Sequence, residues 1–176
     1  IFACHFPSRR GGANSTSAYR ERAANVVRHA ADSVLRLRVN PSVVIMGDFN
    51  DEPRERSFVS GMKAVGVSKL SEKPSARYVI LSDTLTAYDG QVQGTYRFKG
   101  RWNRLDHVVV NREMIGRNSG LRYAKDRCRI LAFPFLLEKT SGDNPVLQLN
   151  RTYLGSYYHG GTGDHLPLIL ELVIDL

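Results

Sequence analysis

The stretch VVIMGDFNDEP, residues 43–53, places an apolar run directly before a group of polar residues. A continuous run of apolar, mostly β-branched residues is typical of a strand covered on both faces. Because side chains alternate along extended backbone, we expect Asp48 and Asn50 to point together and Phe49 to face the core. This stretch therefore predicts a carboxylate and an amide at the mouth of a sheet, where α/β proteins bind ligands. A plain Asp-Asn turn is the alternative.

The length of the chain, 176 residues, predicts a single domain over residues 1–176. A composition of 42% apolar and 24% charged residues is typical of a globular protein. No apolar run approaches the roughly 18 residues of a membrane span, and no signal-peptide pattern is present. The sequence opens at Ile1 inside a strand-like run, so we expect it to be part of a longer protein.

The net charge of +8 is concentrated in one part of the chain. Residues 97–129 contain ten Lys or Arg and three Asp or Glu, which gives 10 − 3 = +7. Clustered guanidinium groups attract and fork onto phosphate oxygens, so this bias suits a phosphate-bearing partner. A solvated basic face is the alternative. Cys4 and Cys128 lack metal-ligand spacing, and we expect two buried thiols rather than a disulfide.

The apolar pattern predicts alternating strands and helices, and hence an α/β layered domain. Helices are expected from Thr16 or Ser17, as N-cap, to Leu37, and from Pro53 to Gly66. The buried face of the first helix is expected to contain Tyr19, Ala23, Val26, Val27, Ala30, Val34 and Leu35. Strands or hairpin arms are expected at residues 3–6, 42–46, 94–102, 104–111 and 165–174, with an irregular, aromatic region over 120–160.

Further Asp and His residues lie at the ends of other predicted strands. His5 ends the first strand, Asp106 lies inside an apolar strand, and Asp164 and His165 precede the last strand. An unpaired carboxylate inside an apolar strand is costly, so Asp106 is expected to have a partner. Four strand ends with Asp, Asn or His predict one common site.

Four motifs, taken in order along the chain, resemble the endonuclease/exonuclease/phosphatase superfamily, which includes DNase I-like nucleases and several phosphatases. The motifs are HFPSRRGG (5–12), GDFND (47–51), GTYRFKGRWNRLDHVVVN (94–111) and GTGDHLP (161–167). The resemblance implies an α/β fold of the DNase I-like four-layer αββα sandwich type. It also points to a bacterial branch that is often exported.

The chain resembles only the C-terminal half of that sandwich, so the N-terminal half is expected to be absent from it. That half brings an Asn and a metal-binding Glu in the family, and no equivalent precedes Ile1. Gly163 also differs, since the family usually has Ser before the Asp-His pair.

The resemblance assigns roles to the residues at the strand ends. His165 resembles a general base or phosphate-polarising histidine, with Asp106 fixing its tautomer and raising its basicity. Asp48 and Asn50 would orient the attacking water and hold a phosphate oxygen. Asp48 is an alternative to His165 as the base.

The same resemblance implies a divalent cation and a second histidine. Asp164 resembles a ligand of Mg²⁺ or Mn²⁺, which prefer hard oxygen donors. His5 resembles the second active-site histidine of the family, on the phosphate or leaving-group side.

Basic and aromatic residues near the motifs are candidates for substrate binding. Arg9 and Arg10, beside two glycines, would grip phosphate, and a solvated loop is the alternative. Trp102 and Arg101 would form a stacking arm, and a packed hairpin is the alternative.

The remaining histidines and one aspartate are not expected to take part in the chemistry. His107 faces the opposite side of the sheet from Asp106, and Asp51 faces away from Asp48 into a turn. Nothing ties His29 or His159 to the site.

These observations together predict a metal-dependent phosphoesterase that hydrolyses phosphodiester or phosphomonoester bonds, as a nuclease or a phosphatase. A non-catalytic phosphate or nucleic-acid binding module, and an inactive fragment of the enzyme, are the alternatives. Half of a sandwich would expose a broad apolar sheet face, so we expect the missing N-terminal half or a second copy to cover it.

Overall fold

A computed structural model describes residues 1–115 and 120–174 of the chain. The helical elements are α1 (Ala13–Leu37) and the short segments η1 (Ser57–Met62), η2 (Val67–Glu72), η3 (Arg112–Ile115) and η4 (Pro134–Leu136). The strands are β1 (Phe2–His5), β2 (Val44–Asp48), β3 (Ala64–Gly66), β4 (Tyr78–Ile80), β5 (Tyr96–Phe98), β6 (Arg101–Asn103), β7 (Asp106–Asn111), β8 (Leu121–Ile130), β9 (Leu137–Lys139), β10 (Leu147–Leu149), β11 (Tyr153–Leu154), β12 (Tyr157–Tyr158) and β13 (Leu168–Ile174).

A five-stranded sheet with the order β1-β2-β7-β4-β3 forms the centre of the fold. β1 is parallel to β2, and β3 is parallel to β4. β7 lies between β2 and β4 and is antiparallel to both. β7 is buried along almost all of its length, because layers cover both of its faces.

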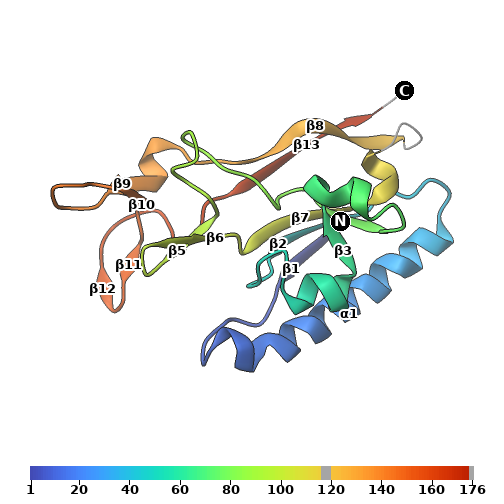
Figure 1. Cartoon of the computed structure of the whole chain (residues 1–176), viewed down its shortest axis with the longest axis horizontal. Helices are drawn as coiled ribbons and strands as arrows, with labels where there is room; N and C mark the ends of the chain where they lie inside the picture. Colours follow the sequence, from blue (N-terminus) through green and yellow to red (C-terminus); the bar gives the residue numbers. More distant parts are fainter. Residues whose placement is uncertain (116–119, 175–176) are drawn as a thin grey trace.

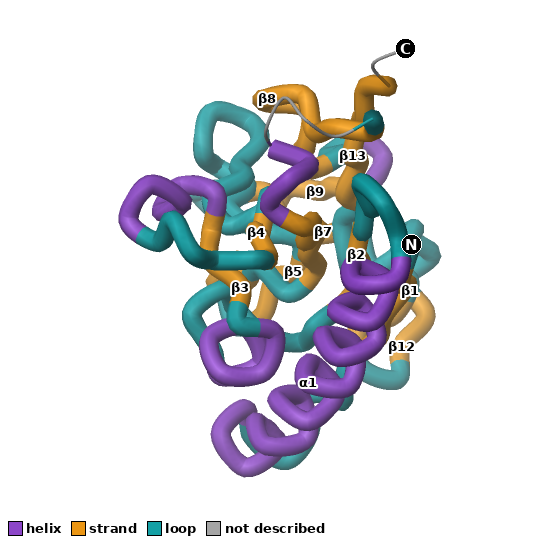
Figure 2. The backbone as a smooth tube through the Cα atoms, turned by 90° about the vertical axis from the view of Figure 1, so that its right-hand side faces the viewer, coloured by secondary structure: helices purple, strands orange, loops and turns teal. Residues whose placement is uncertain are grey.

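The layers on the two faces differ in kind. Figure 1 shows α1 on one side of the sheet and β8 with β13 on the other, and Figure 2 shows the same order from the side. Ala24 and Ala31 of α1 pack with Ile45 and Phe49 in one core cluster. Cys128 of β8 belongs to a second cluster on the opposite face. The predicted α/β fold is confirmed, and the described residues supply the helix–sheet–sheet part of the αββα arrangement.

Helix α1 starts earlier than expected, and its buried face matches the expected one only in part. It begins at Ala13, after Gly12, and its start has no side-chain cap. The hydroxyl of Thr16, the predicted cap, instead donates to the carbonyl of Gly12 at 2.8 Å inside the first turn. Tyr19 and Val26 are exposed, whereas Arg20 is fully buried. Ala23, Val27 and Leu35 pack against the core as expected, whereas an apolar count could not place Arg20 on this face, because Arg20 is buried through an ion pair with Asp51.

The predicted helix from Pro53 to Gly66 is wrong in its extent. The helical segment η1 ends at Met62, where Lys63 takes a left-handed backbone conformation with φ of 54°. The next residues form β3, which places Val65 in the sheet. A left-handed residue ends a helix because its backbone turns the chain away from the helix axis.

The region 120–160 contains a long strand that the sequence did not indicate. β8 pairs with β13, and the register shifts between Leu170 and Leu172. Asp126 has a φ of 62°, so the alternation of β8 changes phase there. Leu121 and Tyr123 pack inward before this point and Cys128 after it, which breaks the period-two pattern.

The apolar face of the central sheet is less exposed than we expected. Leu168, Leu170 and Leu172 of β13 pack against the cluster on that face. Among the residues described, Met46 on β2 still exposes 43% of its surface. No helix in the described ranges is long and apolar enough to cross a membrane.

Candidate active site

Three neighbouring strands place a row of polar side chains at one end of the sheet. The register pairs His5 of β1 with Asp48 of β2, and Asp48 with Asp106 of β7. Residues in one row of a sheet point to the same face, so these side chains converge. Nε2 of His5 lies 3.5 Å from Oδ2 of Asp48. Phe49 and His107 are buried and pack together with ring centroids 5.7 Å apart, as the alternation predicts.

His165 joins this row from the segment that leads into β13. It forms an isolated bridge with Tyr96, and the N–H of Leu166 donates to the carbonyl of Thr95 at 2.8 Å. These backbone contacts bring Nδ1 of His165 to 2.6 Å from Oδ2 of Asp106. The partner that Asp106 was expected to have is therefore His165.

The contact with Asp106 determines which nitrogen of His165 faces the site. A carboxylate accepts a hydrogen bond, so Nδ1 carries the proton and Nε2 keeps a free lone pair in the neutral ring. The ring of Tyr96 lies against the imidazole with centroids 4.8 Å apart. Cζ of Arg151 lies 5.0 Å from the centroid of Tyr96, on which it makes a cation–π contact.

Thr95 is a residue of this site that the sequence analysis did not single out. Its hydroxyl donates to Oδ2 of Asp106 at 2.5 Å and accepts the N–H of Asp106 at 3.2 Å. Thr95 is buried, with 2% of its surface exposed. Its position in the 94–111 motif, one residue before Tyr96, was the available signal, and an isolated Thr gave no reason to expect this bond.

Asn50 reaches Asp48 in a way that differs from the prediction. β2 ends at Asp48, and Asn50 has a φ of 51°, so a turn rather than strand alternation brings the two side chains together. The backbone N–H of Asn50 donates to Oδ1 of Asp48 at 2.8 Å, and its side-chain amide donates to Oδ2 at 3.0 Å. The same amide donates to the carbonyl of Phe6 at 3.1 Å. The side chains of Asp48 and Asn50 therefore meet as expected, but a turn brings them together, which was the alternative to an extended strand.

Burial and neighbouring charges shift the pKa values of Asp48 and His165. Burial raises the pKa of Asp48, the charge of Asp106 adds to this, and the bond from Asn50 opposes it. Burial alone would lower the pKa of His165, but the hydrogen bond and charge of Asp106 outweigh it and raise that pKa. The raised pKa values favour the protonated form of the His165 imidazole and oppose ionisation of the Asp48 carboxyl.

The carboxylates of the row also fit a hard cation in part. Asp48, Asp106 and His165 offer ligand atoms that all lie within 4.8 Å of one another. Carboxylate oxygens suit Mg²⁺ or Mn²⁺, which keep several waters as further ligands. Asp164, the predicted ligand, is exposed and lies outside this group. Its negative charge reaches His165 and raises the pKa of that residue.

The two arginines of the first motif lie in different environments. Nε of Arg9 donates to the carbonyl of Asn50 at 2.6 Å, and its guanidinium pairs with Glu55 and, at 3.7 Å, with Asp51. These contacts tie the loop after β1 to the loop after β2. Arg10 is exposed.

The two candidates for substrate binding on the β5–β6 hairpin also lie in different environments. Arg101 is exposed, whereas Trp102 is half-buried and packs against a third apolar cluster that contains Leu166. The packed-hairpin alternative thus describes Trp102, and Figure 1 shows the hairpin beside the start of β7.

The residues that were not expected to take part in the chemistry lie away from this row. His107 is buried and bonds to Ser82 at 2.9 Å. Asp51 is not the turn residue we expected, since it is fully buried and accepts from Nε of Arg20 at 2.5 Å. His29 is exposed on α1, and His159 pairs with Glu138 at 2.9 Å.

The model of the Endonuclease/Exonuclease/phosphatase family matches residues 1–173. No curated protein matched the sequence.

Several solved structures resemble the fold at low identity. An endonuclease/exonuclease/phosphatase family protein from Bacteroides thetaiotaomicron is 20% identical, with a TM-score of 0.49 over 91% of this chain and 45% of that chain. A mannosyl-6-phosphatase from Bacteroides thetaiotaomicron VPI-5482 is 19% identical, with a TM-score of 0.49 over 89% and 46%. The human Nocturnin catalytic domain is 16% identical, with a TM-score of 0.46 over 98% and 46%. The chain thus spans less than half the length of these proteins.

Proposed function

This chain belongs to the endonuclease/exonuclease/phosphatase family, and we propose that it carries the histidine–aspartate part of a metal-dependent phosphoesterase active site. The observation that carries the proposal is the 2.6 Å contact between His165 and Asp106, in one row with Asp48. Hydrolysis of a phosphate ester needs an oriented water, a group that takes its proton and donors for the developing charge. The row offers side chains that can orient the water and a group that can take its proton.

In this proposal, Nε2 of His165 takes or holds a proton at the phosphate, while Asp106 stabilises the imidazolium that forms. Asp48 and the amide of Asn50 orient the attacking water, and His5 lies on the exposed side of the same row. Asp48 remains the alternative base, and its raised pKa suits that role as well.

In this proposal, Asp164 would hold a divalent cation, as the resemblance to the family implies. When bound, Mg²⁺ or Mn²⁺ supplies charge that stabilises the phosphoryl oxygens. We also propose that the glutamate which the family brings from its N-terminal half completes the metal site, and that this half or a second copy covers the exposed part of the sheet face at Met46.

A non-catalytic phosphate-binding module is the competing function. Such a module has no need for an imidazole held by a carboxylate at 2.6 Å, so the His165–Asp106 contact favours the enzyme.

The test is hydrolysis of bis-p-nitrophenyl phosphate, p-nitrophenyl phosphate, plasmid DNA and a sugar 6-phosphate, with Mg²⁺ or Mn²⁺, by this chain and by the longest natural sequence that contains it. We expect the longer protein to cleave at least one class. Binding of these compounds without turnover by either form, in both metals, would favour the binding module.

A further inference from the structure

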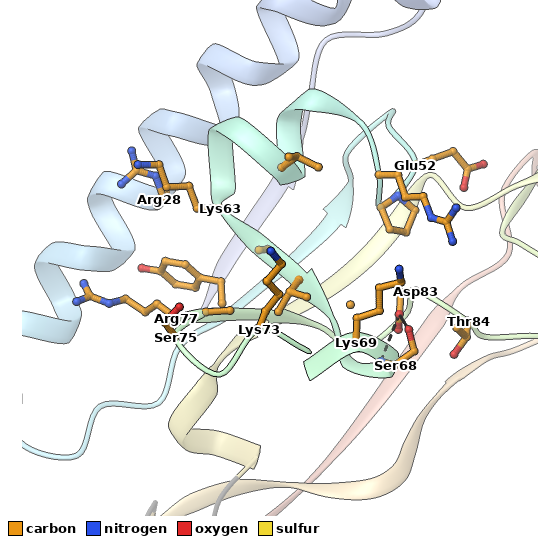
Figure 3. A pocket seen from close by; sticks show the side chains of 18 of the residues that line it. Arg28, Glu52, Lys63, Ser68, Lys69, Lys73, Ser75, Arg77, Asp83 and Thr84 are labelled. Atoms are coloured by element: carbon orange, nitrogen blue, oxygen red, sulfur yellow. Dashed lines mark hydrogen bonds between the residues drawn. The ribbon is translucent and has the colours of Figure 1, made fainter. Parts of the chain in front are cut away.

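Strand β3 lies at the outer end of the central sheet and borders a large cavity. Among the described residues, β4 is the one strand that pairs with it. All three of its residues, Ala64–Gly66, line a cavity of about 1060 Å³. Figure 3 shows the side chains that surround this space, which we call the edge groove. The backbone groups on the outer side of β3 therefore face open space.

The lining of the edge groove combines apolar and charged side chains. Pro53, Val59, Val65 and Ala76 contribute apolar surface. Val59 exposes 59% of its surface, which is high for a large apolar side chain. A strand that added to β3 would place alternate side chains against this surface.

The charge of the edge groove is positive. Its lining includes seven basic residues, namely Arg28, Arg54, Lys63, Lys69, Lys73, Arg77 and Arg104, and three acidic residues, namely Asp32, Glu52 and Asp83. Each acid is already engaged: Asp32 with Tyr78 at 2.8 Å, Glu52 with the N–H of Arg104 at 2.9 Å, and Asp83 with Ser68 at 2.5 Å.

Part of the positive charge lacks an ion-pair partner among the residues that the structure describes. Asp32 forms ion pairs with Arg28 at 3.2 Å and with Arg77 at 3.0 Å. Within residues 1–115 and 120–174, no ion pair engages Arg54, Lys63 or Lys73. These cations line the same cavity as β3, so they attract a negatively charged partner to its open edge.

We propose that the edge groove binds an extended, acidic segment of a partner protein, which adds to the sheet as a strand beside β3. The open backbone edge supplies main-chain hydrogen bonds, the apolar lining receives every second side chain, and the unpaired cations select Glu and Asp at the others. The proposal is independent of the phosphoesterase activity, because none of the residues of the active-site row lines the groove.

The lining favours a peptide over a nucleic acid. Its one aromatic residue, Tyr78, is buried and its hydroxyl donates to Asp32, so the groove has no aromatic face on which a base would stack. Lysines beside an edge strand also have a second known use, which is to keep two copies of a protein from pairing through their edges. That use predicts no affinity for an acidic strand.

The experiment is fluorescence anisotropy with labelled heptapeptides that alternate Glu with Val, Ile or Thr. We expect binding that weakens as NaCl rises from about 50 to about 300 mM, since exposed charges are screened over that range. An N-methylated copy of the best peptide, which lacks the backbone donors of one edge, should bind at least about tenfold more weakly. In NMR spectra, the amides of Ala64–Gly66 should shift on binding.

Charge-reversal variants distinguish peptide binding in the edge groove from general attraction of an acidic peptide to a basic protein. Lys63→Glu with Lys73→Glu should weaken binding at least about tenfold, and Arg22→Glu with Lys139→Glu, two exposed reversals outside the groove, should not. His165→Ala should bind as the wild type does. The proposal is overturned if none of the peptides binds, if N-methylation has no effect, or if a pentathymidylate, whose four phosphates match four Glu side chains in charge, binds equally well and shifts the same amides.

Discussion

Asp106 and His165 are 59 residues apart in the sequence, yet Oδ2 of the carboxylate lies 2.6 Å from Nδ1 of the imidazole. The contact depends on two separate backbone arrangements. The β2–β7 register fixes Asp106, and the bridge to Tyr96 fixes His165. The pair is therefore held by the fold rather than by the flexibility of either side chain.

Removing either partner should abolish most of the proposed turnover. His165→Ala and Asp106→Asn should each lower kcat by about 10²- to 10⁴-fold, the usual contribution of a positioned acid or base. The double variant should cost little more than the worse single one, since residues that act as a unit are not additive. Steady-state kinetics on the substrate cleaved by the longer protein measure this. His29→Ala is the control, and full activity of His165→Ala on every substrate would refute the site.

The protonation of His165 should depend on Asp106. The raised pKa means that the charged pair stabilises the folded protein below about pH 6.5, the ordinary histidine value, and that this stabilisation is lost as pH rises through the raised pKa. Asp106→Asn removes the main raising cause and leaves burial, so the pKa should fall. An NMR titration of the His165 ring in metal-free protein measures it, and an unchanged midpoint would contradict this account.

Thr95 should act through Asp106. Thr95→Val keeps the shape of a buried side chain and removes the 2.5 Å bond, a loss of about 1 kcal/mol or more. We expect kcat to fall about five- to tenfold with KM unchanged, and the NMR titration of His165 to shift. Thr86→Val, at an exposed position, is the matched control. Equal kinetics and titration for both variants would show that Thr95 has no influence on the pair.

Breaking the Arg20–Asp51 pair should destabilise the fold. Both side chains are fully buried, with Nε and Oδ1 2.5 Å apart. Arg20→Ala leaves a buried carboxylate without its main partner, which costs about 3–5 kcal/mol. Urea unfolding measures the loss. Arg127→Ala, which breaks an exposed pair with Glu171, should cost less than about 1 kcal/mol, and similar values for the two variants would contradict the expectation.

Metal binding should be weak in this chain. If Asp164 is a ligand and the glutamate of the family is supplied by another segment, Mg²⁺ should bind the longer protein at least about tenfold more tightly than this chain. Calorimetry with Mg²⁺ and Mn²⁺ gives both affinities, and Asp164→Asn should weaken both. Equally tight binding by the two forms, unaffected by that variant, would remove Asp164 from the site.

The sequence predicted the elements whose burial follows a simple pattern. The continuous apolar runs that became β2 and β7 were found because β7 is buried along nearly all of its length and the first residues of β2 are buried. The convergence of Asp48, Asp106 and His165 was predicted from their positions at strand ends. The rest depended on contacts between distant segments.

Two misses show why. β8 was not recognised because the left-handed Asp126 shifts its alternation halfway along the strand. Part of the buried face of α1 was misassigned because Arg20 is buried through its bond to Asp51, and a charged residue counts as exposed in any apolar pattern. In both cases a local rule failed because a tertiary contact decided the outcome.

Gly47, between Met46 and Asp48, limits how the site can vary. A Cβ at this position would lie 1.9 Å from the carbonyl oxygen of Cys4, and its φ of 135° is one that side chains rarely adopt. Any substitution would push β1 away from β2 and so separate His5 from Asp48. A saturation library of residues 46 and 47, selected for activity, should therefore return many residues at the first position and glycine alone at the second.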